Sequence, residues 1–383
     1  MSHRKLVSFL IAWAAAALPA GALAEEEPAK FGLTNPGATA RTGAVVGIPW
    51  REVVGRVPGV TAASLRVLDP GGKPAGLQVF PAVGAPEELL VLTPPLAAAQ
   101  RLPLRIVAGE GEVAGAGVRR VGARYAPEHR SDIAWENDRM AFRVYGPGHR
   151  DATHAGGIDV WSKRTREPIL AKWYKTGVNG DYEVDLGEGC DATKVGAGPG
   201  CGATAYLAPD GTVVMSPVFA SWKVLAEGPL RAVVELVYHP VEVGPASITE
   251  TRRISYDLGA PVFRIEARFT AVGDAANIRP LAGMLCPDEH ALSGNVATTW
   301  FSADKGEALN GRIGLGLILP QPAEVVARTD RAVFFPLAGD LSAPVVWHAG
   351  ASWSKALDSP TPEAWERELR AWSAALAAPV RVE

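Results

Sequence analysis

The 383-residue sequence has no surplus of positive charge: 38 Lys and Arg residues stand against 41 Asp and Glu residues, for a formal net charge of −3. Proteins that bind nucleic acid or an anionic membrane surface need a clear basic excess. We therefore expect neither as a partner. An anionic sugar remains compatible with this balance, because a few local Arg side chains can bind a carboxylate.

Several catalytic signatures are also missing. The sequence contains no Gly-x-Ser-x-Gly elbow, no His-Glu-x-x-His pair, no phosphate-binding loop, no internal repeat and no heptad pattern. Two common hydrolase chemistries therefore lack support.

Cysteine is scarce, with three residues in the chain. In an oxidising compartment, Cys190 and Cys201 could close a small disulfide loop across a Gly-rich segment. A metal site that uses Cys286 and His290 is the alternative, although thiolate sites usually have closer paired spacing.

Long apolar runs are absent beyond the N-terminus. Basic residues at positions 3–5 precede a mostly apolar run over residues 6–18, which Pro19 breaks, and Ala22 and Ala24 follow at the positions that a signal peptidase reads. This order predicts a cleavable signal peptide over residues 1–24, because the run is too short to span a bilayer. We expect a periplasmic or secreted protein; a single membrane anchor is the alternative.

The chain contains 41 Gly and 31 Pro, and 48% of its residues are hydrophobic, which indicates many turns around a sizeable core. After a flexible leader over residues 25–43, short apolar segments alternate with turn residues up to residue 121. Residues 64–68, 77–80, 88–92 and 103–107 are examples. This spacing predicts a small N-terminal β-sandwich over residues 44–121.

Residues 122–383 favour a mainly β fold with longer strands. Residues 262–269 alternate between apolar and charged, residues 232–238 are almost continuously apolar, and residues 248–258 form a further predicted strand. We expect a large antiparallel two-sheet β-sandwich whose concave sheet carries the ligand site. A solvated charged face is the alternative for that surface.

One helix is predicted near the C-terminus. Thr361 can cap it, Pro362 suits its first position, and an apolar stripe steps by four, three and four residues from Trp365 to Leu376. We interpret it as a packing helix within the domain over residues 122–383.

Residues 131–201 are densest in functional side chains. Sugar sites pair aromatic platforms with planar hydrogen-bonding groups. The candidate substrate-binding residues are Trp135, Glu136, Asn137, Asp138, Arg143, Asp159, Trp161, Lys172, Trp173 and Tyr174. Each Trp has a structural alternative, because a buried Trp belongs more often to the core.

Several runs in this order resemble a secreted bacterial family known as domain of unknown function 4861. They are Ala-Trp-Glu-Asn-Asp-Arg at residues 134–139, Gly-Ile-Asp-Val-Trp at 157–161, Lys-Trp-Tyr at 172–174, Gly-Glu-Gly with Asp at 187–191, Glu-Thr-Arg-Arg-Ile-Ser at 250–255 and Ala-Gly-Ala-Ser-Trp at 349–353. The resemblance implies a fold similar to galactose-mutarotase-like supersandwich proteins and a role in breaking down uronate-containing polysaccharides. Family members often carry a His before the Gly-Glu-Gly run; this sequence has Leu186 there, so no role for that His carries over.

Two reactions suit an acidic sugar. β-Elimination needs a group that neutralises the uronate carboxylate, a base for the C5 proton and an acid for the leaving oxygen. Hydrolysis needs two carboxyl groups that flank the bond, and Glu136, Asp138, Asp159, Glu188 and Asp191 are candidates. For elimination, Arg139 or Arg143 could clamp the carboxylate, His154 or His290 could be the base, and Tyr145, Tyr174 or Tyr182 could deliver the proton. We expect a lyase slightly ahead of a hydrolase, with catalytic candidates Arg139, Tyr145, His154, Tyr182, Glu188 and His290.

Other interpretations stay open. Asp185, Glu188 and Asp191 in a Gly-containing loop could bind calcium. His154 and His290 could each be a hydrogen-bonded structural residue instead of a catalyst. A non-catalytic sugar-binding accessory protein and a mutarotase-like isomerase are the alternative functions. We expect Arg139→Ala to abolish activity and to leave the melting temperature nearly unchanged. A large drop in melting temperature would indicate that Arg139 is a structural ion-pair residue.

Overall fold

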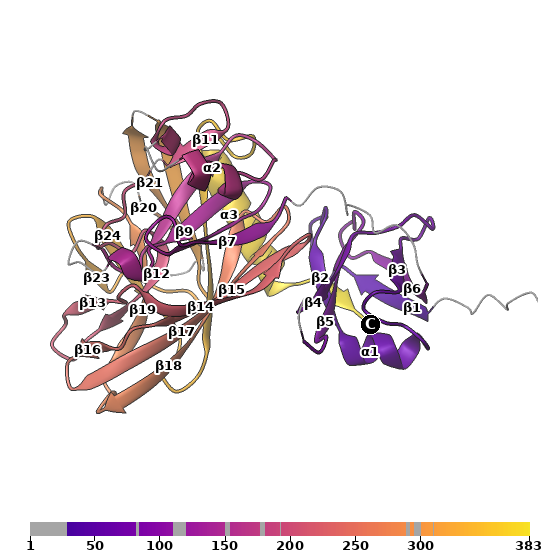
Figure 1. Cartoon of the computed structure of the whole chain (residues 1–383), viewed down its shortest axis with the longest axis horizontal. Coiled ribbons are helices and arrows are strands. Elements are labelled where there is room, and N and C mark those ends of the chain that lie inside the picture. The colour runs from indigo at the N-terminus through magenta and orange to yellow at the C-terminus, as the bar shows by residue number, and fades with distance from the viewer. Residues whose placement is uncertain are drawn as a thin grey trace, which may run out of the picture.

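A computed structural model describes residues 29–81, 84–109, 120–149, 154–176, 181–191, 193–288, 292–294, 300–308 and 310–383. The predicted signal peptide and His290 lie outside the described residues. The fold is mainly antiparallel β and has two lobes (Figure 1). Within the described part of the chain, no helix combines the length and apolarity that crossing a membrane requires.

The smaller, N-terminal lobe consists of residues 29–109 and the last strand of the chain. Two sheets with the orders β26-β1-β6-β3 and β2-β5-β4 enclose its own apolar core. The elements are β1 (Ala29–Thr34), β2 (Val45–Pro49), α1 (Trp50–Arg56), β3 (Leu65–Leu68), β4 (Leu77–Phe80), β5 (Glu88–Leu92), β6 (Arg101–Ala108) and β26 (Arg381–Val382).

The flexible leader predicted for residues 25–43 is wrong where the structure describes it. Strand β1 pairs with β6 and β26, and its alternate side chains Phe31 and Leu33 are buried in the core of the lobe. The Ala-, Glu- and Pro-rich composition before it hid this strand.

The larger lobe spans residues 120–378 and contains three sheets. The first has the order β11-β10-β9-β8-β7, the second β13-β12-β19-β24-β23, and the third β14-β15-β17-β18-β25-β22-β21-β20, with β16 beside β17. The first two are built from β7 (Gly122–Ala126), β8 (Asp132–Glu136), β9 (Met140–Val144), β10 (Ile158–Lys163), β11 (Gly189–Asp191), β12 (Cys201–Leu207), β13 (Val213–Met215), β19 (Arg279–Leu285), β23 (Ala327–Arg328) and β24 (Ala332–Pro336).

The third sheet is the largest, and it packs against the other two. Its strands are β14 (Phe219–Glu227), β15 (Arg231–Tyr238), β16 (Val241–Val243), β17 (Ala246–Asp257), β18 (Val262–Gly273), β20 (Leu292–Ser293), β21 (Trp300–Ala308), β22 (Gly311–Ile318) and β25 (Val345–Trp353). Strand β17 alternates strictly between buried and half-buried residues. Its inward Ile254 and Tyr256 join side chains of the other sheets in one core cluster, as expected of a sandwich.

Helix α3 (Pro362–Ala377) confirms the predicted C-terminal helix. The Thr361 hydroxyl accepts from the Ala364 N–H, and Pro362 begins the helix. Trp365 and Leu369 are buried against the sheet. Gly316 on β22 makes room for them, because a Cβ there would lie 2.7 Å from Leu369.

The two lobes contact each other at β4 and β15. The Gln78 amide oxygen accepts from the N–H groups of Leu230 and Arg231, at 2.8 Å each, and its nitrogen donates to the Arg231 carbonyl. Phe80 and Leu90 pack on Leu230 and Val233 beside this contact. The outer face of β15 is thus covered, which explains its almost continuous apolar sequence.

The disulfide considered for Cys190 and Cys201 is not formed. All three cysteines are buried, free thiols. The Cys201 thiol donates to the Gly350 carbonyl at 3.1 Å, and the Cys286 thiol donates to the Asp288 carbonyl at 3.2 Å.

Candidate functional site

The outer face of the sheet β11-β10-β9-β8-β7 carries the candidate site. Side chains alternate between the two faces of a strand. The register places Arg143 opposite Asp159 and Trp161 opposite Asp191, while Trp135 points the other way, into the sandwich core. The helix α2 (Leu170–Thr176) and the short 3-10 helix η3 (Asp181–Glu183) contribute further side chains to this outer face.

Arg143 is the central cation of the site. Its Nη2 bonds to Asp159 and lies 3.0 Å from Asp191 Oδ2, and its Nη1 lies 3.9 Å from Asp132 Oδ2. The Arg143 side chain is 6% exposed, and its guanidinium lies over the Trp161 ring. Burial, and then the negative charge of Asp159, raise the pKa of Asp191 well above its ordinary value. One buried cation therefore faces three carboxyl groups.

Asp132, at the start of β8, contacts two imidazoles. His129 Nδ1 lies 3.1 Å from its Oδ2, and His149 Nε2 lies 3.1 Å from its Oδ1. Burial alone would raise the pKa of Asp132, but the contacts with His129 and His149, then the charge of Arg143, outweigh burial and hold the pKa at about 2. Asp132 is therefore ionised at neutral pH.

An unusual backbone brings these groups together. Arg130 and Ser131 both have positive φ, at 51° and 64°, a region that non-glycine residues seldom adopt. The Gly146 N–H donates to Asp132 Oδ1 at 3.0 Å, and a Cβ at position 146 would lie 1.8 Å from the Ser131 carbonyl oxygen. Only glycine fits there. Positive φ angles at non-glycine residues such as Arg130 and Ser131 are a form of backbone strain that is common at functional sites.

Tyr182 extends the cluster. Its hydroxyl lies 2.9 Å from His129 Nε2 and 3.4 Å from Arg143 Nη1. Asp132, His129 and Tyr182 thus form a chain of polar contacts, and burial raises the pKa of the Tyr182 phenol. The His129 side chain is 22% exposed, so solvent reaches the chain at its middle member.

Tyr145 and His154 lie beside His149. The ring centroids of Tyr145 and His154 are 4.8 Å apart, and those of His149 and His154 are 4.7 Å apart. His154 is half-buried, whereas Tyr145 is buried. Among the residues singled out from sequence, the fold gathers here Arg143, Tyr145, His154, Asp159, Trp161, Tyr174, Tyr182 and Asp191.

Glu136, a predicted sugar contact, has another role. Its carboxylate accepts from Lys163 Nζ at 2.7 Å and from the N–H groups of Ile169 and Leu170, at the start of α2. Its side chain is 3% exposed. Because both oxygens have internal partners, the prediction that Glu136 binds substrate is wrong.

Asn137 and Asp138 also have structural roles, because they connect two turns of the larger lobe. The Asn137 amide donates to the carbonyls of Asp257 and Ala260, at 2.7 and 2.9 Å, and Asp138 accepts from the Gly259 N–H at 2.8 Å. Both residues therefore fasten the β8–β9 turn to the β17–β18 turn, and their prediction as sugar contacts is not supported.

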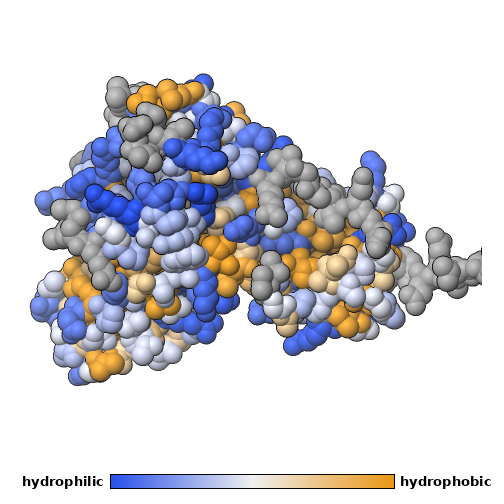
Figure 2. Space-filling view, in the orientation of Figure 1, coloured by the Kyte–Doolittle hydropathy of each residue, from blue (hydrophilic) through white to orange (hydrophobic). Residues whose placement is uncertain are grey.

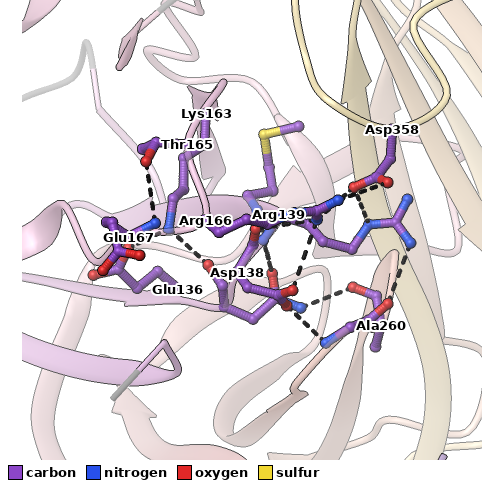
Figure 3. A network of polar contacts seen from close by, with 12 residues as sticks. Glu136, Asp138, Arg139, Lys163, Thr165, Arg166, Glu167, Ala260 and Asp358 are labelled. Atoms are coloured by element: carbon purple, nitrogen blue, oxygen red, sulfur yellow. Dashed lines mark hydrogen bonds and ion pairs between the residues drawn. The ribbon is translucent and has the colours of Figure 1, made fainter. Parts of the chain in front are cut away.

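Arg139 belongs to the same structural network (Figure 3). Its guanidinium lies 2.7 Å from Glu368 and 3.5 Å from Asp358, and Arg166 also pairs with Asp358. Arg139 thus connects the β8–β9 turn to the C-terminal segment. The structure does not support the prediction that Arg139 clamps a uronate carboxylate, because its guanidinium pairs with two carboxylates of the chain.

The predicted aromatic platforms are core residues. Trp135 packs against Phe263 in the sandwich, and Trp161 packs against Trp173 and Tyr174 beneath α2. All of these tryptophans are buried. They shape the site from below and do not offer an exposed ring face to a sugar.

The three acidic residues considered for calcium do not converge. Asp185 pairs with Arg164 at 3.0 Å, Glu188 with Lys172 at 2.7 Å, and Asp191 with Arg143. Each carboxylate faces a different basic side chain, so this set does not form the predicted cation site. Glu188 and Lys172, both candidates from sequence, form an exposed pair instead.

Four members of the cluster escaped the sequence analysis: His129, Asp132, His149 and Thr193. The Thr193 hydroxyl bonds to Asp159. One signal could have revealed the imidazoles, since three of the seven histidines in the chain fall within residues 129–154. His290, predicted as a base, lies outside the described residues.

A groove lies between the lobes, where the surface narrows (Figure 2). This groove has a volume of about 810 Å³, and the charged outer face of the large sheet forms one wall. Burial, and then the charge of Arg264, lower the pKa of His348 in this wall to about 4. Other lining residues are Arg231, Arg253, Glu266 and Trp372. The ligand site expected on this sheet remains a prediction.

Residues 33–382 match the family described as "Domain of unknown function (DUF4861)". The chain belongs to this family. This DUF4861 chain is also 27% identical, over 277 residues, to "Uncharacterized protein P7" of Formosa agariphila, an alignment that covers 68% of this chain and 69% of that protein.

Two solved structures share the fold of the DUF4861 chain. One is a protein in the glycosyl hydrolase family 38 from Enterococcus faecalis, with a TM-score of 0.54, 10% identity, and coverage of 94% of this chain and 47% of that chain. The other is an alpha-mannosidase from Enterococcus faecalis V583, with a TM-score of 0.54, 10% identity, and coverage of 92% and 45%. The chain thus spans about half the length of these proteins, and the likeness concerns the fold.

Proposed function

We propose that the protein is an exported carbohydrate-active enzyme that cleaves uronate-containing polysaccharide or oligosaccharide by β-elimination. The observation that carries this proposal is the contact chain Asp132–His129–Tyr182, with Arg143 beside the Tyr182 hydroxyl. The family membership and the fold shared with glycoside hydrolase structures support a carbohydrate substrate. Export rests on the signal peptide predicted from residues 1–24.

The chemistry assigns a proton-transfer role to Tyr182. Burial raises the pKa of its phenol, so it is protonated at neutral pH and suited to donate a proton to the leaving glycosidic oxygen. His129 orients the hydroxyl from 2.9 Å, and ionised Asp132 orients His129 in turn. His154, half-buried beside Tyr145, is the candidate base for the C5 proton.

Hydrolysis is the second candidate reaction, because Asp159 and Asp191 both bond to Arg143 and the pKa of Asp191 is raised. A glycosidase uses two carboxyl groups, of which the general acid has a raised pKa. However, Asp159 is 1% exposed, whereas a glycosidase carboxylate must reach the scissile bond. Elimination therefore ranks first.

The experiment is an activity screen with purified protein on pectic, alginate-like and ulvan-like glycans, followed by ultraviolet absorbance and by reducing ends. A new conjugated double bond is the result expected of a lyase. Reducing ends without that absorbance would instead indicate a hydrolase. Binding without either product would indicate an accessory sugar-binding protein, and an altered anomeric ratio of a free sugar would indicate a mutarotase-like isomerase.

A further inference from the structure

We infer that His129, Asp132 and His149 bind a divalent transition-metal ion of the zinc class. One ligand atom from each residue lies within 4.8 Å of the other two. Nitrogen ligands around tetrahedral zinc stand about 3.3 Å apart, given metal–ligand bonds of roughly 2.0–2.1 Å. Small side-chain rotations thus suffice to bring the three residues into coordination.

His149 supplies an independent observation. It is 6% exposed, yet neither ring nitrogen makes a hydrogen bond among the described residues. Its Nε2 nonetheless lies 3.1 Å from Asp132 Oδ1. A buried imidazole without a hydrogen bond is costly, and a metal ion between these two atoms would satisfy both.

The charge of the site favours a cation. Arg143 Nη2 pairs with Asp159 and Asp191, and Arg143 Nη1 lies 3.9 Å from Asp132 Oδ2. The carboxylate of Asp132 therefore has no close, dedicated positive partner among the described residues apart from the two imidazoles. Two neutral imidazoles and one carboxylate are a donor set that zinc prefers.

The surrounding contacts resemble those that orient metal ligands. The Gly146 N–H holds Asp132 Oδ1, and Tyr182 contacts the far nitrogen of His129. With Nδ1 on the metal, His129 Nε2–H donates to the Tyr182 oxygen. The Tyr182 proton is then free to face a substrate.

The ion would also supply a group that the proposed reaction needs. Arg139 and Arg143, the clamps predicted for a uronate carboxylate, are both occupied by carboxylates of the chain. A metal with an open coordination position can neutralise that carboxylate and so acidify the C5 proton. This role rests on the proposed function, whereas the binding of the metal does not.

The test uses the full mature chain without an affinity tag, freed of metal by a chelator and titrated with Zn²⁺ and Co²⁺. We expect one ion per chain after dialysis, a visible Co²⁺ spectrum of low coordination number, and a higher Tm with Zn²⁺. His149→Ala and the more conservative His149→Gln should lose at least tenfold in Zn²⁺ affinity. His239→Ala, which removes an imidazole outside the cluster, should retain full affinity.

Two results would overturn the metal site: a wild-type chain that retains no ion and shows no Co²⁺ spectrum, or His149 variants that bind as the wild type does. The first measurement requires no variant to fold. Neither readout involves a glycan, so a metal site without lyase activity, and lyase activity without a metal, are separate outcomes.

Discussion

Arg139 and Glu368 lie 2.7 Å apart and join the β8–β9 turn to helix α3. The Arg139 side chain is 15% exposed, and Asp358 supports it at 3.5 Å. We predict that Arg139→Ala lowers the free energy of unfolding by about 2 kcal/mol, because the partly buried Glu368 carboxylate loses its cationic partner and Asp358 retains only Arg166. Urea denaturation measures this change.

The matched control is Arg367→Ala, which removes an exposed Arg from the same helix and should change the free energy of unfolding by less than about 0.5 kcal/mol. An Arg139→Ala chain that melts like the wild type but loses activity would restore the catalytic role first expected of Arg139.

Local signals predicted the elements well. Thr361 and Pro362 mark the start of α3, and the alternation in residues 262–269 falls within β18. Both signals act between close neighbours in the chain, where spacing determines which face is buried. The family, and with it the supersandwich, followed from ordered motifs.

Long-range partners could not be predicted in this way. Arg139 and Glu368 are 229 positions apart, and the two-residue strand β26 pairs with β1 from the other end of the chain. The approach of His149 to Asp132 depends on two successive positive-φ residues, Arg130 and Ser131. Nothing in the residue types at those two positions indicates that conformation.

Glu136 and Lys163 form a buried ion pair at 2.7 Å, and the Lys163 side chain is fully buried. We predict that Glu136→Gln lowers the free energy of unfolding by about 3 kcal/mol, because it leaves a buried ammonium without a negative partner. Thermal and urea unfolding check this. Glu188→Gln breaks an exposed pair with Lys172 and should cost less than about 0.5 kcal/mol; equal losses in both variants would argue against the buried pair.

The three buried thiols predict a particular reactivity. Burial raises the pKa of Cys190 to about 12, and all three cysteines are free. Because the thiolate is the reactive form, a thiol reagent should label the folded chain hardly at all and should label three groups after denaturation without reductant. Labelling of a single group in denaturant would reveal a disulfide and contradict the structure.

His348 predicts a pH dependence of stability. Burial, and then Arg264, lower its pKa from 6.5 to about 4 in the folded chain. The folded state therefore resists a proton that the unfolded state accepts. The contribution of neutral His348 to the free energy of unfolding is therefore complete above about pH 6.5. It falls by roughly 1–3 kcal/mol as the pH decreases toward 4. Urea titrations across this range should show the loss, and His348→Gln should flatten it; an unchanged slope in that variant would assign the loss to other groups.

The most direct test of the proposed chemistry compares Tyr182→Phe with the wild type on a uronate glycan that the screen identifies, by the rate at which the ultraviolet absorbance of the unsaturated product rises. The variant removes one oxygen and keeps the ring that packs against Trp161. We predict a fall in kcat of about 10²–10⁴-fold with an unchanged thermal melt, and no fall for Tyr125→Phe, whose ring stacks on Trp222 away from the cluster. A Tyr182→Phe enzyme that forms the product at the wild-type rate would contradict the assignment of this cluster as the active site.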